Sequence, residues 1–221
     1  MEKIYYHPFC PKSRLLKIIT NEYINNLESE KIDYWRDIER VRKIDPLGEL
    51  PIIIHGNKAI SGIYAICEFL KDSFPESHFI PNSIEELAEV RRLIYWINTR
   101  FHREVTAHFI NEKLIKLTML REDINTNSLR IARNNLYEHC RYFKTLIDNY
   151  GYLATEKISF ADIFLASHVS IIDYFEEVNW DRIYWMKNWY ATIKSRPSFR
   201  EILKYRLSVF SPPKYYENPD F

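Results

Sequence analysis

The chain is poor in residues that build special turns and covalent frameworks: 4 of its 221 residues are glycine and 3 are cysteine. So few glycines predict a mostly helical chain with few special turns. The three cysteines are widely spaced, which argues against both a disulfide framework and a metal knuckle. No apolar run approaches membrane-spanning length, so the protein is not expected to be membrane-embedded.

The chain also lacks a strong charge of either sign, with a formal net charge of +1 at pH 7. Because nucleic-acid binders usually carry a strongly basic surface, nucleic acid is not an expected partner. The first residues show no charged-then-apolar signal layout, and we expect a reduced, cytoplasmic protein. The histidines show no spacing that gathers metal ligands, and no glycine-rich phosphate loop is present. We therefore predict neither a metal nor a bound nucleotide.

The most informative stretch begins with Leu50-Pro51 and the apolar run 52–54. A proline is tolerated at the first residue of a strand, and a cis X-Pro bond there would be a deliberate feature. The sequence predicts a buried strand entered through Pro51, then a short turn over 55–58 that leads into a helix. That helix carries apolar residues at one-face spacing, Ile63, Ile66, Cys67, Leu70 and Phe74.

Strands and helices alternate in the first third of the chain. We predict strands over 4–7 and 31–34 and a helix over 13–23. This thioredoxin-like domain is expected to span 1–74, and the proline-bearing segment 75–83 is expected to be a linker. The alternation of strands and helices therefore predicts an α/β domain, which the linker separates from a second, helical domain.

The second domain, expected over 84–210, is helical almost throughout. Two apolar stripes mark its long helices: one is Leu87, Val90, Ile94, Ile97 and Phe101, and the other is Leu129, Ala132, Leu136, Cys140 and Phe143. Ser159 and Asp162 have the spacing of a capping box at a helix start. The last segment, 211–221, holds three prolines and is predicted to be an extended tail.

Taken in order, the Leu50-Pro51 strand entry, the Ser159/Asp162 box and the late Arg196-Pro197-Ser198-Phe199 resemble the glutathione-transferase fold. The resemblance covers nearly the whole chain. It implies a thioredoxin-fold N-terminal domain and an all-helical C-terminal domain.

A narrower resemblance rests on the stretches 89–93, 101–106 and 195–200 and on the C-terminus from Pro212-Pro213 to Asp220-Phe221. These are similar to the alphaproteobacterial FtsZ-localized protein A family of transferase-like cell-division proteins. The resemblance implies a homodimer that binds the tubulin-like GTPase FtsZ at the division site and is not a glutathione enzyme. It also implies a tail tied to signalling toward the septal wall-synthesis machinery.

The glutathione clamp is weak in this chain. Transferases carry Glu or Gln followed by Ser at the places that hold Ser61 and Gly62 here, so no cofactor is predicted. The alternative is an enzyme that uses glutathione, with Pro51 supplying a backbone contact. In that alternative Cys10 is the candidate thiol, because Cys10-Pro11 places it beside a helix N-terminus where the pKa of a thiol falls. The opposing interpretation is a partly buried, inert cysteine.

Ser13 and the tyrosines Tyr5 and Tyr6 are further transferase candidates. Ser13 stands where a first-turn residue would cap a helix, which is the commoner role of serine. Tyr5 and Tyr6 lie in a predicted strand, where tyrosine is favoured by packing alone. A plain transferase acting through Ser13 is therefore a third, weaker hypothesis.

Partner-binding candidates are more numerous. Arg92, Trp96, Arg100 and Arg103 share one helix face, which suits a partner site or a dimer contact, because tryptophan and arginine are enriched at interface hot spots. A solvated face is the alternative. The resemblance places a partner-contacting tryptophan at Trp35. In the tail, charge and aromatic anchors would come from Lys214, Tyr215, Tyr216, Asp220 and Phe221, the alternative being a strap that packs on its own domain.

Two hypotheses follow. The first is a non-enzymatic, dimeric scaffold that binds FtsZ filaments and promotes constriction. The second is a glutathione-dependent thiol transferase that uses Cys10. Affinity for glutathione separates them.

Overall fold

The computed structural model describes residues 1–33 and 35–218 of the chain. They form two compact units, Met1–Ser77 and His78–Phe221. Within the described ranges no helix has the length and apolar character needed to cross a membrane.

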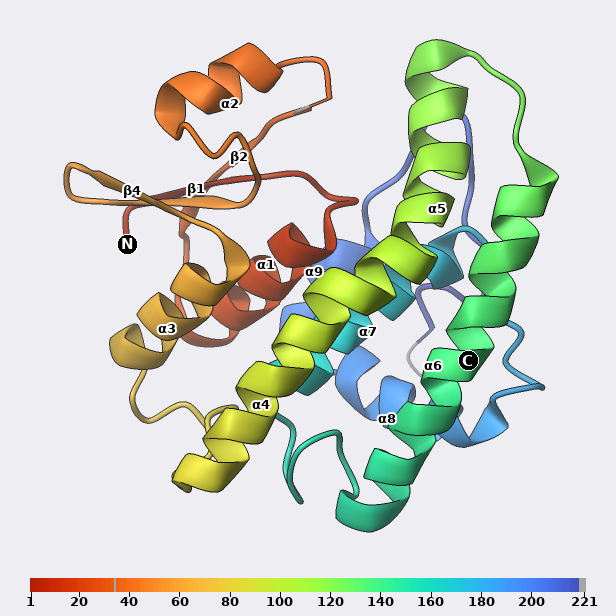
Figure 1. Cartoon of the computed structure of the whole chain (residues 1–221). Helices are drawn as coiled ribbons and strands as arrows, with labels where there is room; N and C mark the ends of the chain where they lie inside the picture. The colour runs from red at the N-terminus through yellow and green to blue at the C-terminus, as the bar shows by residue number, and fades with distance from the viewer. Residues whose placement is uncertain (34, 219–221) are drawn as a thin grey trace. The chain divides into compact units, whose positions relative to one another are not determined.

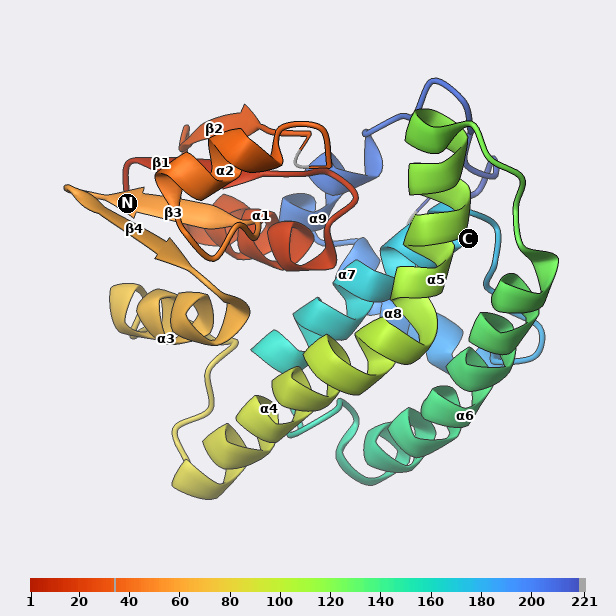
Figure 2. The same ribbon diagram turned by 45° about the horizontal axis from the view of Figure 1, so that its top comes forward.

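The first unit is built on a four-stranded mixed sheet in the order β2-β1-β3-β4. Strand β1 pairs parallel with β2 and antiparallel with β3, and β3 pairs antiparallel with β4. In this unit α2 lies on one face of the sheet and α1 and α3 lie on the other (Figures 1 and 2). The elements are β1 (Lys3–Tyr6), α1 (Pro11–Tyr23), β2 (Glu28–Lys31), α2 (Ile38–Ile44), β3 (Ile52–His55), β4 (Lys58–Ser61) and α3 (Ile63–Ser73).

The buried core of this unit follows the predicted pattern. Ile52 and Ile53 of β3 are fully buried. Along α3, Ile66 and Leu70 are fully buried and Ile63 is nearly so. The Leu50-Pro51 peptide at the entry to β3 is cis. Phe74 lies at the C-cap of α3 and stacks on Tyr23 with ring centroids 4.9 Å apart.

The structure corrects the sequence prediction at three places in this unit. The second strand is Glu28–Lys31, three residues before the predicted 31–34, because the buried Ile32 follows the strand instead of lying in it. The turn after β3 is a hairpin that closes into β4 before α3 begins. Helix α2 was not predicted, since Val41 is its one fully buried side chain.

The second unit is helical. Its elements are α4 (Ile84–Trp96), η1 (Ile97–Thr106, π-helical), α5 (Ala107–Ile110), η2 (Asn111–Leu120, π-helical), α6 (Thr126–Tyr150), α7 (Phe160–Tyr174), α8 (Tyr184–Lys194) and α9 (Pro197–Leu203). From α4 to η2 the helical backbone follows on without an intervening loop, and α6 lies alongside it (Figure 2). Every residue of α7 is buried, so this helix forms the centre of the unit.

The two predicted stripes of this unit are confirmed as its core. All of the second stripe along α6 is buried, and the first is buried from Val90 onward. The predicted capping box is also present at the start of α7. The Asp162 carboxylate accepts hydrogen bonds from the backbone N–H of Ser159 at 2.9 Å and from its hydroxyl at 2.8 Å.

Candidate functional site

The Cys10 thiol lies at the N-cap of α1, beside the helix N-terminus as predicted, but it is 5% exposed. Its Sγ donates to the backbone carbonyl of Leu50 across 3.5 Å. A reactive thiol needs an accessible, electropositive setting, whereas a buried structural cysteine is inert. The geometry therefore resembles the structural alternative more than the enzymatic one.

Ser13 does not cap α1, because the helix begins two residues earlier, at Pro11. The serine is fully buried in the first turn, and its hydroxyl accepts the backbone N–H of His7 at 3.2 Å. The expectation that Ser13 caps the helix is thereby corrected. Its hydroxyl ties the preceding loop to the helix.

His7 closes the same loop. Its Nδ1 accepts the backbone N–H of Phe9 at 3.1 Å, so the neutral imidazole carries its proton on Nε2. Burial, together with the charges of Lys31 and Arg14, lowers the pKa of His7 to about 3. Asp33 Oδ1 lies 3.8 Å from Nε2, too far to offset that burial. The loop before α1 is thus held by internal hydrogen bonds around a neutral histidine.

The residues at the positions of the glutathione clamp, Ser61 and Gly62, have structural roles within the first unit. Ser61 ends β4 and its hydroxyl donates to Asp45 Oδ2 at 2.8 Å. Gly62 is the N-cap of α3 with φ of +78°, a backbone conformation that side chains rarely adopt. Pro51 is buried immediately before β3. Of the two tyrosines in β1, Tyr6 is buried and Tyr5 is half-buried against the Lys3 ammonium.

Trp35 also belongs to this unit. It is half-buried, and its ring meets the His7 ring edge-on with centroids 4.3 Å apart. The tryptophan therefore packs against the histidine and keeps part of its surface accessible. Tyr34 beside it lies outside the described residues.

In the second unit four residues predicted to share a helix face are linked directly or through shared partners. We call this group the arginine–tryptophan face: Arg92, Trp96, Arg100 and Arg103. The Arg100 guanidinium lies 5.0 Å from the Trp96 ring centroid, and Arg92 Nη2 donates to the Tyr142 hydroxyl at 2.5 Å. Trp96 stacks on Tyr142 with centroids 4.9 Å apart. The stacked pair of rings thus lies between the cations of Arg92 and Arg100, an arrangement that favours binding at a surface.

A hydrogen-bonded triad supports this face from beneath. Trp96 Nε1 donates to Nδ1 of the buried His139 at 3.0 Å, and the His139 Nε2–H donates to Glu104 Oε2 at 3.0 Å. Burial lowers the pKa of His139, against the opposing effect of Glu104. His139 is therefore neutral, and its two nitrogens fix the orientation of the indole.

Glu104 accepts hydrogen bonds from two arginines of the face and from His139. It accepts from Arg100 at 3.3 Å, from Arg103 at 3.1 Å and from His139. Burial acts against ionisation, but these three hydrogen bonds together lower the pKa of Glu104. Sequence reasoning missed Glu104, His139 and Tyr142 as parts of this face. The spacing of Glu104 four residues after Arg100 was the available signal.

The tail packs on its own unit over the part that the structure describes. Lys214 is exposed, Tyr215 is half-buried and Tyr216 is fully buried. The Tyr216 ring meets Tyr174 edge-on at 5.3 Å, while the Tyr215 hydroxyl donates to Asp173 Oδ1 at 3.3 Å. Tyr216 therefore anchors the tail and is not presented to a partner in this arrangement. Asp220 and Phe221 lie outside the described residues.

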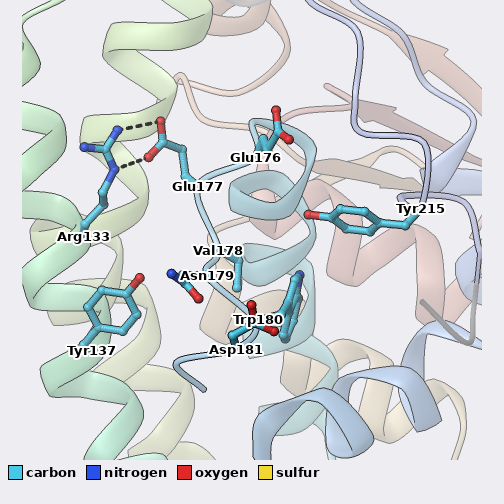
Figure 3. Close-up of a pocket in the computed structure, with 9 residues that line it drawn as sticks. All are labelled: Arg133, Tyr137, Glu176, Glu177, Val178, Asn179, Trp180, Asp181 and Tyr215. Carbon is cyan, nitrogen blue, oxygen red and sulfur yellow. Dashed lines mark hydrogen bonds and ion pairs between the residues drawn. The ribbon is translucent and has the colours of Figure 1, made fainter. Parts of the chain in front are cut away.

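A groove of about 540 Å³ opens beside Tyr215 in the same unit. Figure 3 shows it between α6 and the segment after α7, with the Arg133–Glu177 ion pair on one side and Tyr215 on the other. The lining residues are Arg133, Tyr137, Glu176, Glu177, Val178, Asn179, Trp180, Asp181 and Tyr215. Among the described residues no group of His, Cys, Asp or Glu could hold a metal ion.

The chain is similar over its full length to a curated protein. The chain is 30% identical over 222 residues to FtsZ-localized protein A of Caulobacter vibrioides, covering 99% of this chain and 97% of that protein. No family model matches the chain.

Solved structures agree over the whole chain. A glutathione S-transferase from Rhodospirillum rubrum F11 superposes with a TM-score of 0.93 at 35% identity, and FzlA from C. crescentus superposes with a TM-score of 0.93 at 29% identity. Both comparisons cover 100% of each chain. The predicted fold class, a transferase-like α/β domain followed by a helical domain, is confirmed.

Proposed function

This chain belongs to the family of FtsZ-localized protein A, and from that premise we propose that it is a non-catalytic scaffold that binds FtsZ filaments and promotes cell constriction. The observation that supports this proposal most is the full-length similarity to a protein named for its location with FtsZ. We place the protein in the cytoplasm at the division site.

The first unit supports a role without catalysis. An acyl, thiol or conjugation reaction needs a nucleophile that a substrate can reach. Here the Cys10 thiol and the Ser13 hydroxyl are both buried and both hydrogen-bonded to backbone groups of their own unit. Ser61 donates its hydroxyl to Asp45 instead of leaving it for a ligand.

The second unit supplies the surface that we assign to FtsZ. Arg92, Arg100 and Arg103 keep their guanidinium groups at the surface, and Trp96 lies between them. Arginine and tryptophan combine charge, hydrogen bonding and apolar area, which is why they dominate interface energetics. Trp35 offers a second, smaller contact.

We propose a homodimer as the active form. A filament repeats the same binding site, so two linked sites gain effective concentration without either being tight. The arginine–tryptophan face is also suited to a dimer contact, and the two uses compete for the same side chains. We assign the C-terminal tail to a different partner, the septal wall-synthesis machinery.

The second hypothesis keeps the glutathione chemistry. Cys10 lies at a helix N-cap next to the carbonyl that precedes the cis Pro51, and a related solved structure is named a glutathione S-transferase. In this alternative, Cys10 or Ser13 would act on glutathione held by Pro51, Ser61 and Gly62. Unchanged glutathione-linked activity in a Cys10→Ser variant would exclude the thiol form of it.

Co-sedimentation with GTP-polymerised FtsZ from the same source tests the first hypothesis. We expect the chain to pellet with filaments, and we expect Arg100→Glu to weaken that pelleting about tenfold, because it reverses a charge at the centre of the proposed binding face. Arg121→Glu is the matched control, since Arg121 is an exposed arginine of the same unit outside the face.

A truncated chain shows whether the body or the tail binds the filament. A chain that ends at Ser211 should still pellet, which would assign filament binding to the body and leave the tail for a second partner. If wild-type protein fails to pellet at low and physiological salt alike, the FtsZ assignment is wrong and Cys10 becomes the group to study.

A further inference from the structure

The described part of the C-terminal tail, and Phe210 just before it, are fastened to the rest of the second unit by several contacts. The Tyr174 hydroxyl donates to the carbonyl of Phe210 at 2.7 Å. The Tyr215 hydroxyl donates to Asp173 Oδ1 at 3.3 Å, and the Tyr216 ring packs edge-on against Tyr174. Arg206 and Glu217 add an ion pair at the surface. The tail is therefore a strap held mainly by residues from the end of α7.

The strap lies over three buried side chains, which we call the socket: Asp173, Tyr174 and Lys194. Asp173 and Lys194 are both fully buried. Lys194 Nζ donates to the Tyr215 carbonyl at 3.4 Å and lies 5.9 Å from the Tyr216 ring centroid. Both charged side chains are thus in contact with the strap: Asp173 meets the Tyr215 hydroxyl, and Lys194 meets the Tyr215 carbonyl and lies near the Tyr216 ring.

Burying the two charged side chains of the socket away from water costs desolvation free energy. Asp173 Oδ1 accepts from Trp180 Nε1 at 2.8 Å as well as from Tyr215, but Oδ2 has no hydrogen-bond partner among the described residues. An incompletely bonded buried carboxylate carries a desolvation penalty. Burial accordingly raises the pKa of Asp173 to about 6 and lowers that of Lys194. Lifting the strap would let water reach both charges and would recover part of this penalty.

The groove gives access to the strap from one side. Tyr215 and Trp180, which both donate to Asp173, also line the 540 Å³ groove (Figure 3). The strap is therefore not enclosed by the body. Its Tyr215 anchor is half-exposed, while its Tyr216 anchor is inside.

We propose that the C-terminal tail is a releasable strap: docked, it fills the socket, and released, it presents Tyr215 and Tyr216 to a partner. This inference rests on the proposed function of the tail as a partner contact, and it supplies a step that the function requires. Tyr216 is 0% exposed when the strap is docked, so a partner cannot use this ring until the strap has left the socket.

The socket also indicates what such a partner looks like. To displace the strap, a partner surface must replace what the socket provides, namely a carboxylate that accepts the Tyr215 hydroxyl and an aromatic pocket for Tyr216 that is bordered by a cation. The tail is thus expected to bind an aromatic-lined protein pocket that carries both an acidic and a basic side chain, and not an apolar groove.

The indole N–H resonance of Trp180 in a ¹H–¹⁵N spectrum of the full-length protein tests the proposal. This group donates to Asp173, which also accepts from the strap. Tyr216→Ala should move the resonance to a released position. Tyr215→Phe removes only one hydroxyl and should place the resonance between the two, with the released population raised about tenfold. Lys214→Ala, on an exposed tail residue, should leave the wild-type position.

Two other indoles act as internal controls. Trp189 donates to Asp162 and Trp96 donates to His139, and neither resonance should move. If they shift together with Trp180 in Tyr216→Ala, the tail is an integral part of the core and the proposal is wrong. If Trp180 is unmoved in Tyr216→Ala and Tyr215→Phe, the tail does not occupy the socket. The protein is measured alone, so a failure of FtsZ binding would leave this result unchanged.

Discussion

The loop before α1 and the arginine–tryptophan face treat their polar groups in opposite ways. Around the loop, Cys10, Ser13 and His7 direct their side chains inward and bond to backbone groups of their own unit. On the face, Arg100 and Arg103 keep partly exposed guanidinium groups that are oriented by Glu104. The loop uses its polar side chains to close itself, and the face uses them to stay organised while exposed.

This difference bears on function more than the shared fold does. Catalysis requires a group that a substrate can reach, whereas recognition requires an exposed surface whose side chains lose little freedom on binding. In this chain the arginine–tryptophan face, whose exposed arginines are oriented by Glu104, belongs to the helical unit. Scaffold and enzyme can therefore share one fold, because the fold fixes neither activity.

Acid should destabilise the folded chain through His7, and this is the largest effect we expect. Between pH 6.5 and 3 the unfolded chain binds a proton at His7 and the folded chain does not, because the pKa of His7 falls from 6.5 to about 3 on folding. The free energy of unfolding should therefore fall as pH is lowered. His7 should account for about 3 kcal/mol of that fall between pH 7 and pH 4.

Urea unfolding of wild type and His7→Asn at both pH values measures this contribution. Asparagine keeps an acceptor for the Phe9 N–H but does not titrate, so the variant should lose less stability on acidification. An identical pH dependence in the two proteins would show that His7 is not held neutral by the fold.

The order of the arginine–tryptophan face depends on one carboxylate. Glu104→Gln removes the charge that accepts from Arg100, Arg103 and His139, and we expect a loss of about 1–2 kcal/mol in the free energy of unfolding. Glu89→Gln is the matched control, because Glu89 pairs with Arg92 at the surface and its loss should cost about 0.5 kcal/mol. Equal losses in the two variants would mean that Glu104 does not organise the face.

Thiol chemistry gives a smaller test of the closed loop. Cys10, Cys67 and Cys140 are all buried, and burial raises the pKa of Cys67 and of Cys140 to about 12. Alkylation by iodoacetamide should be at least about tenfold slower in the native protein than in urea at every cysteine. Rapid native labelling of Cys10 alone, followed by mass spectrometry, would instead mark it as a reactive thiol.

Most elements of the fold could be predicted from local patterns in the sequence. The stripes of α3, α4 and α6 and the Ser159–Asp162 box are visible in the sequence because neighbours three and four residues apart share a helix face. Strands β2 and β4 were misplaced or missed, since Glu28–Lys31 is polar throughout and β4 is short and exposed at the sheet edge. Edge strands carry little apolar signal.

The candidate sites divide in the same way. The four face residues could be grouped from helical spacing alone, but His139 and Tyr142 reach the face from α6 and left no local sign. The Asp173–Tyr215 contact joins residues 42 positions apart. Burial of Cys10, Ser13 and Tyr216 likewise depends on packing between distant segments, which a single sequence does not display.

Co-sedimentation of Cys10→Ser with GTP-polymerised FtsZ tests the central claim most directly, because it removes the candidate nucleophile of the thiol-transferase hypothesis. If the helical unit carries the function, the variant will pellet as wild type does, within about twofold, under conditions in which Arg100→Glu does not. Loss of pelleting in Cys10→Ser, with the melting temperature unchanged, would contradict the account and return the function to the first unit.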